Sequence, residues 1–132
     1  MNLTIHEELP EQVFEIDRAK LRAYADASGD QNPIHQDEEF AKSVGLPNVI
    51  AHGMYTMALA GEAVRRWVGD DRSVVEFSAR FTKPVVVPAD VKVRISFTGK
   101  VSGVSHNEVS IDVNAICDGV KVLGQTKVRV RL

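Results

Sequence analysis

The hydrophobic pattern of this chain changes its period near the middle of the sequence. From about residue 17 to residue 68 the apolar residues recur at helical spacing, whereas from residue 73 to residue 132 apolar and polar residues alternate. Alternation with a period of two and one polar face is typical of an antiparallel sheet. The first half therefore predicts helices, and the second half predicts a sheet with one apolar face.

The helix expected from Gly53 to about Val68 leaves few choices of fold. Its first part, Met54-Tyr-Thr-Met-Ala-Leu-Ala-Gly61, is apolar on nearly every side, and a helix of that kind is buried. We therefore expect an α+β arrangement in which a curved antiparallel sheet wraps around this helix. Because one sheet cannot enclose a helix completely, we also expect a dimer formed through a sheet edge.

The remaining elements are predicted from caps and turns. Asp17 can cap a helix that ends near Ser28-Gly29, and Asp37 can cap a second helix that ends before Gly45. The pair Asp118-Gly119 predicts a tight hairpin. Strands are expected near residues 13–16, 75–81, 91–98, 109–115 and 127–131.

Length, charge and cysteine content exclude several classes of protein. A chain of 132 residues predicts a single domain over residues 1–132, and a net charge of -2 gives no basic surface for nucleic acid. The one cysteine, Cys117, cannot form an intrachain disulfide and is expected in the core. Since we find neither a signal peptide nor an apolar stretch long enough to cross a bilayer, we expect a cytoplasmic protein without membrane partners.

A polar segment between the first and third helices does not fit a core. It reads Ala27-Ser-Gly-Asp-Gln-Asn-Pro-Ile-His-Gln-Asp37. Proline biases the preceding Asn32 towards an extended shape, so the bend can bring Asp30 and His35 together. An imidazole beside a carboxylate is suited to moving a proton. The same residues also suit an ordinary turn, in which Asp30 or Asn32 binds backbone amides.

Gly53 has two possible uses at the start of the buried helix. The first amides of a helix lack an internal partner, so a glycine here can let a ligand oxygen approach its N–H and form an oxyanion hole. Alternatively, the glycine only permits a tight entry turn. The neighbouring His52 is interpreted as a structural residue. The acidic and histidine residues of this region fit no common zinc spacing, so we expect no metal and no other cofactor.

These residues together resemble a known motif. Tyr24-Ala-x-x-Ser28-Gly-Asp30-x-Asn32-Pro-Ile-His35-x-Asp37, followed by Gly45 and by Ile50-Ala-His-Gly53-Met54, is similar to the hydratase-2 motif of the MaoC-like family. That family comprises (R)-specific enoyl-thioester hydratases and (3R)-hydroxyacyl dehydratases with the hot-dog fold. The resemblance extends over almost the whole chain and implies that fold here.

The resemblance also implies a role for each matched residue. Asp30 and His35 match the catalytic pair, which activates the water and handles the α-proton. Gly53 matches the residue whose backbone N–H polarises the thioester carbonyl. Ser28 and Asn32 match loop positions that support the pair.

The implied reaction is the reversible hydration of trans-2-enoyl thioesters to (3R)-hydroxyacyl thioesters in fatty-acid metabolism. The substrate would be carried on CoA or on an acyl carrier protein, and the sequence leaves open which of Asp30 and His35 is the proximal base. The basic residues considered for the phosphate of the carrier arm are Arg65, Arg66, Arg80 and Lys83.

One position departs from the pattern of the homodimeric hydratases. Those proteins often carry a serine eight positions after the matched glycine, where this chain has Gly61. A glycine there, like the sequence Trp67-Val-Gly-Asp70, is similar to the catalytic B subunit of actinobacterial (3R)-hydroxyacyl-ACP dehydratases, which pair with a second hot-dog subunit. The resemblance therefore implies either a homodimer or a heterodimer.

Two other functions stay open. One is an acyl-thioester thioesterase of the same fold, in which water attacks the carbonyl carbon. The pattern Asp30-x-Asn32-Pro-x-x-His35 argues against it. The other is a non-catalytic acyl-binding partner subunit of a dehydratase heterodimer, and the presence of both Asp30 and His35 argues against that.

Overall fold

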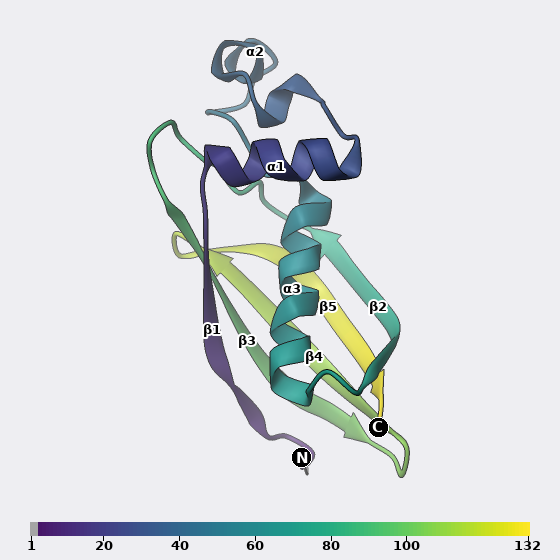
Figure 1. The fold of residues 1–132 in the computed structure, drawn as a ribbon. Helices are drawn as coiled ribbons and strands as arrows, with labels where there is room; N and C mark the ends of the chain where they lie inside the picture. Colours follow the sequence, from purple (N-terminus) through teal and green to yellow (C-terminus); the bar gives the residue numbers. More distant parts are fainter. Residues whose placement is uncertain (1–2) are drawn as a thin grey trace.

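The computed structural model describes residues 3–132 as three α-helices and five strands (Figure 1). The helices are α1 (Arg18–Ser28), α2 (Glu38–Ser43) and α3 (Gly53–Val68), with a short 3₁₀ helix, η1, at Pro33–His35. The strands are β1 (Glu8–Ile16), β2 (Ser73–Phe81), β3 (Val93–Val104), β4 (Glu108–Cys117) and β5 (Val120–Arg131). All of the pairings are antiparallel, and the strand order is β1-β3-β4-β5-β2.

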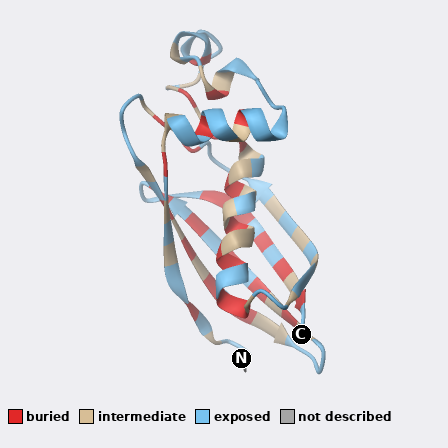
Figure 2. Ribbon diagram, viewed as in Figure 1, coloured by how far each residue is buried: buried red, intermediate tan, exposed pale blue. Residues whose placement is uncertain are grey.

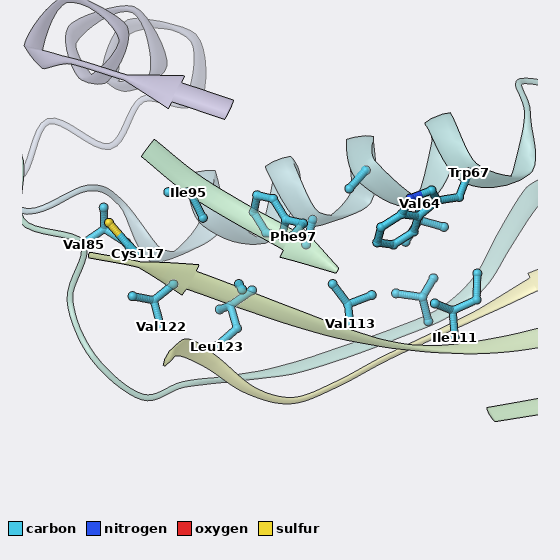
Figure 3. Close-up of a cluster of buried hydrophobic side chains, with 14 of the residues drawn as sticks. Val64, Trp67, Val85, Ile95, Phe97, Ile111, Val113, Cys117, Val122 and Leu123 are labelled. Atoms are coloured by element: carbon cyan, nitrogen blue, oxygen red, sulfur yellow. The ribbon is translucent and has the colours of Figure 1, made fainter. Parts of the chain in front are cut away.

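The sheet curves around α3, as Figure 1 shows. Alternate residues of the central strands are buried against the helix (Figure 2). The side chains of this core include Ile95 and Phe97 from β3, Ile111 and Val113 from β4, Leu123 from β5, and Val64 and Trp67 from α3 (Figure 3). The expected α+β hot-dog arrangement is confirmed.

The C-terminal end of α3 packs closely against the sheet. A Cβ atom at Gly99 of β3 would lie 2.8 Å from the ring of Trp67, so only glycine fits beneath the indole. The indole Nε1 donates a hydrogen bond of 2.9 Å to the carbonyl of Pro10 on β1. Trp67 thus joins α3 to two strands of the sheet.

The predicted caps and turns are present. The Asp17 side chain accepts a hydrogen bond from the amide of Lys20 at 2.9 Å, and α1 ends at Gly29 with φ of 81°. The Asp37 side chain caps α2 by accepting from the amide of Phe40. Asp118 and Gly119 have φ of 52° and 74°, as a tight two-residue hairpin requires. Cys117 is buried, as expected.

Two expectations about burial and strand boundaries are wrong. The first half of α3 is not buried on every side, because the sheet covers one face and leaves Met54 58% exposed. Val91 lies before β3 and is exposed. Phe81, at the end of β2, is 53% exposed, yet its ring lies close to Gly53 at the start of α3.

A short ladder connects the segment before α3 to the loop after β2. Ile50 pairs with Val86, the amide of Ala51 donates to the carbonyl of Val85, and the amide of Val87 donates to the carbonyl of Val49, both at 2.8 Å. This ladder fixes the N-terminal end of α3, which lies beneath α1 in Figure 1. None of the helices within residues 3–132 is long and apolar enough to span a membrane.

Candidate active site

The loop from Ser28 to His35 is folded by a series of short-range hydrogen bonds. The Ser28 hydroxyl accepts from the amide of Asp30 at 3.2 Å, and the Asp30 carboxylate accepts from the amide of Asn32 at 3.2 Å. The Asn32 side chain in turn accepts from the amide of Ile34 at 3.1 Å and caps η1. The interpretation of this segment as a turn is therefore correct, and the turn is also what positions the two candidate catalytic side chains.

His35 is buried and its protonation pattern is set by the main chain. Its Nδ1 lies 2.7 Å from the carbonyl oxygen of Ile50. A carbonyl only accepts, so Nδ1 carries the hydrogen and Nε2 keeps its lone pair in the neutral ring. The amide of Ile50 also donates to the carbonyl of Ile34 at 3.1 Å. One residue of the neighbouring segment thus holds η1 and the imidazole through its two backbone groups.

The carboxylate and imidazole groups of the region come close together. A carboxylate oxygen of Asp30 and one ring nitrogen from each of His35 and His52 all lie within 4.8 Å of one another. A single water molecule can bridge two groups that are up to about 5.6 Å apart. Asp30 is exposed to solvent, whereas His35 is only 7% exposed. The pair thus combines a carboxylate that solvent can reach with a buried imidazole.

His52 is the residue of this cluster that the sequence analysis left out of the chemistry. It is 1% exposed, its Nε2 lies 3.1 Å from the carbonyl oxygen of Asp30, and its ring stacks on that of His35 with centroids 3.8 Å apart. Burial lowers the pKa of His52 below its ordinary value of 6.5. The signal in the sequence is its place directly before Gly53, which could not reveal contacts with a loop 22 residues earlier.

The same three side chains are the group among residues 3–132 that could hold a metal ion. Asp37 does not belong to it, because its carboxylate caps α2. In each imidazole one nitrogen is engaged by a backbone carbonyl, at Ile50 for His35 and at Asp30 for His52.

Gly53 opens α3 beside a cavity of about 350 Å³. His35, Gly53 and Thr56 line it together with apolar walls from Ile50, Ala51, Phe81, Pro84, Val85 and Val122, and with Thr82 and Lys83. A Cβ atom at Gly53 would lie 3.1 Å from the ring of Phe81. The φ of Gly53 is not in the left-handed region, so the lack of space beside Phe81, rather than a tight turn, explains the glycine.

The amide end of α3 carries a partial positive charge. The first N–H groups of a helix have no partner within it, and the aligned peptide dipoles add to their positive character. The N-cap residue, His52, gives no side-chain hydrogen bond to these amides. The start of the helix therefore combines amides that have no partner within the helix with a cavity that has apolar walls.

The basic residues considered for the carrier phosphate lie in different surroundings. Arg65 pairs with Glu62 and Asp70, and the side-chain hydrogen bond with Arg65 is the main cause that lowers the pKa of Glu62 to about 2. Arg66 also pairs with Glu62. Lys83 lines the same cavity as His35.

Comparison with known proteins finds relatives that are named as a dehydratase and as a hydratase of thioesters. The chain is 45% identical over 80 residues to 3-hydroxyacyl-thioester dehydratase X of Mycobacterium tuberculosis, covering 61% of this chain and 28% of that protein. It is 34% identical over 106 residues to the peroxisomal enoyl-CoA hydratase 2 of Arabidopsis thaliana, covering 79% and 28%. This chain thus spans little more than a quarter of the length of either relative.

A solved structure and a family profile extend the likeness to the whole fold. A structure described as a MaoC-like dehydratase superposes with a TM-score of 0.95 at 37% identity, over 99% of this chain and 41% of that one. The profile of the MaoC like domain matches residues 3–118, so the chain belongs to the MaoC-like domain family.

Proposed function

We propose that this chain acts as a single MaoC-like domain that reversibly adds water to trans-2-enoyl thioesters to give (3R)-hydroxyacyl thioesters. The observation that carries the proposal is the cluster at the start of α3. Within it the carboxylate of Asp30 lies beside the buried imidazole of His35, and His35 shares a cavity with the first amide of the helix at Gly53. Together the three groups meet the two demands of the reaction.

The first demand is to activate the thioester. The carbonyl withdraws electrons from the C2–C3 double bond, so water attacks C3 and negative charge develops on the thioester oxygen. An amide N–H aimed at that oxygen stabilises the transition state, and losing one such donor costs about 3 kcal/mol. Gly53 is our candidate donor, because it begins α3 and lines the cavity.

The second demand is to move protons. Water loses a proton as its oxygen bonds to C3, and C2 gains one as the double bond disappears. With Nδ1–H held by the carbonyl of Ile50, His35 offers Nε2 as an acceptor, while Asp30 can orient the water. Because both groups project from one short loop, we expect addition to one face of the double bond.

The relatives support the same reaction class. One is named as a dehydratase of 3-hydroxyacyl thioesters and another as an enoyl-CoA hydratase, and these names describe the two directions of one equilibrium. Lys83 at the cavity edge is our candidate for the phosphate of the carrier arm, whether the carrier is CoA or an acyl carrier protein.

We further propose that a second hot-dog domain covers the open face of α3, as a homodimer or a heterodimer. Met54 and Ala58 lie one turn apart and are exposed, and the edge strand β2 exposes Val74 and Phe81. Such an apolar surface next to an unpaired strand edge favours association. Light scattering of the purified chain, alone and with candidate subunits, distinguishes the two assemblies.

An ultraviolet assay tests the activity. We expect the enoyl absorbance of crotonyl-CoA, or of longer enoyl chains on CoA or carrier protein, to fall as water adds, with the (3R) product identified by chiral analysis. Release of free thiol instead would favour the thioesterase. Unchanged absorbance for every substrate, alone and with candidate subunits, would contradict the proposal and favour a non-catalytic acyl-binding subunit.

A further inference from the structure

His52 contacts both members of the candidate catalytic pair. Its Nε2 lies 3.1 Å from the carbonyl oxygen of Asp30, and its ring lies against the ring of His35, with 3.8 Å between centroids and 24° between planes. These contacts come from a separate segment of the chain, since His52 immediately precedes α3. The mechanism above gives the residue no task.

A purely structural role does not explain a histidine at this position. His52 is the N-cap residue of α3 but makes no side-chain cap hydrogen bond, and Ser, Thr, Asp or Asn caps a helix better. Its Nδ1 is buried and has no hydrogen-bond partner among residues 3–132. A buried polar atom without a partner lowers stability, so stability alone does not favour this side chain.

The hydrogen bond to Asp30 determines where the proton of His52 lies. A carbonyl oxygen only accepts, so Nε2 carries the hydrogen and Nδ1 does not, which leaves the ring neutral. The effect of burial on the pKa of His52 has the same direction. The neutral ring of His52 therefore packs against the imidazole of His35 without placing a second charge beside it.

Two tyrosines restrict the movement of His52. The ring of Tyr24 lies 4.7 Å from that of His52 at 60°, and Tyr24 stacks on Tyr55 at 5.0 Å. With His35 also in contact, the His52 ring is surrounded by aromatic groups. Its orientation is thereby fixed relative to the loop that carries the pair.

We propose that His52 is a positioning residue for Asp30 and His35: its Nε2–H holds the main chain of Asp30, and its stacked ring holds the imidazole of His35 in place. The inference rests on the proposed hydratase function and deepens it. His52 itself would touch neither substrate nor water.

Two substitutions separate the two contacts. His52→Phe keeps a ring for stacking but removes the donor, whereas His52→Gln keeps a donor near the position of Nε2 but removes the ring. His106→Gln, at an exposed turn, is the control. The kcat and KM of enoyl-thioester hydration are measured for all four proteins, together with their thermal unfolding.

We expect unequal losses of activity in the two variants. His52→Phe should lower kcat by about tenfold to a hundredfold with little change in KM, because a misplaced reacting group costs that much. His52→Gln should retain more of kcat, because it keeps a donor for the carbonyl of Asp30. Wild-type kcat in His52→Phe, or a larger loss of kcat in His52→Gln than in His52→Phe, would overturn the inference.

Amide hydrogen exchange tests positioning without substrate. In His52→Phe we expect the amides of Asn32 and Ile34 to exchange at least about tenfold faster than in the wild type and in His52→Gln, with amides of β3 and β4 unchanged. Equal exchange in all proteins would refute positioning. An inactive wild-type protein would instead refute the hydratase function, and the exchange result would still decide the role of His52 in the loop.

Discussion

At its C-terminal end α3 is fixed by apolar packing: Trp67 is buried over Gly99, and its one polar atom is bonded to the carbonyl of Pro10. At its N-terminal end the helix begins beside a cavity, with a buried histidine that leaves Nδ1 without a partner. Buried polar groups are normally satisfied. The contrast indicates that one end was shaped for stability and the other for chemistry.

The largest expected effect lies at the polar end. Asp30→Asn and His35→Ala should each lower kcat by about two to four powers of ten, because each removes a proton-handling group. The melting temperature should change little for Asp30→Asn, whose side chain is exposed and keeps an oxygen for the amide of Asn32. Steady-state kinetics with an enoyl thioester measure kcat, and thermal unfolding measures the melting temperature. Wild-type turnover in either variant would remove that residue from the mechanism.

The matching change at the packed end should act on stability alone. Trp67→Ala should lower the free energy of unfolding by about 3–5 kcal/mol, the usual range for removing a buried aromatic side chain, while kcat per folded molecule is retained. Urea titration measures the loss. Lys100→Ala, at an exposed position of β3, should stay within about 0.5 kcal/mol. A loss of kcat in folded Trp67→Ala would show that the two ends are coupled.

A smaller effect is expected at Gly53. Gly53→Ala adds a Cβ atom 3.1 Å from the ring of Phe81, which must shift beside the helix amides. We expect kcat to fall about tenfold, because a small displacement at the reacting carbonyl is enough. Gly61→Ala is a matched control, since its Cβ would lie 3.3 Å from Phe77, away from the cavity. Equal kcat in the two variants would contradict a role for the start of α3.

The smallest effect concerns acid stability. The groups facing His52 are Asp30, His35 and Tyr24, and burial lowers the pKa of His52 in the folded state. Between that lowered pKa and 6.5 the unfolded chain binds the proton more readily, so stability is lost as the pH falls below about 6.5. Melting temperatures measured from pH 7.5 to pH 5 should fall less in His52→Phe than in the wild type. Identical slopes would show that His52 makes no contribution.

Local rules predicted much of the fold. Asp17 and Asp37 cap their helices because a short side-chain oxygen reaches the first amides. The Asp118-Gly119 turn follows from the positive φ that these residues tolerate. The start of α3 at Gly53 and its end before Gly69 also agree with the sequence. These features depend on neighbours along the chain, which a sequence displays directly.

The features that escaped prediction depend on contacts between distant segments. The closeness of the Phe81 ring to Gly53 is one such feature, because the alternation of residues in β2 does not reveal which segment faces Phe81. The bond from His35 to the carbonyl of Ile50 and the stacking of His52 on His35 join segments that only the folded chain brings together. The motif predicted which residues gather, whereas the tautomers of both histidines required the acceptors to be known.

The hydrogen bonds of Ile50 have a consequence for redesigning the cavity. Its amide and carbonyl bind Ile34 and His35, and the residue also lines the cavity. Because main-chain groups are common to all residues except proline, a substitution at this position can reshape the cavity while the hydrogen bond to Nδ1 of His35 is kept. Under the proposed mechanism, acyl-chain preference and proton transfer are in this way separable at one position.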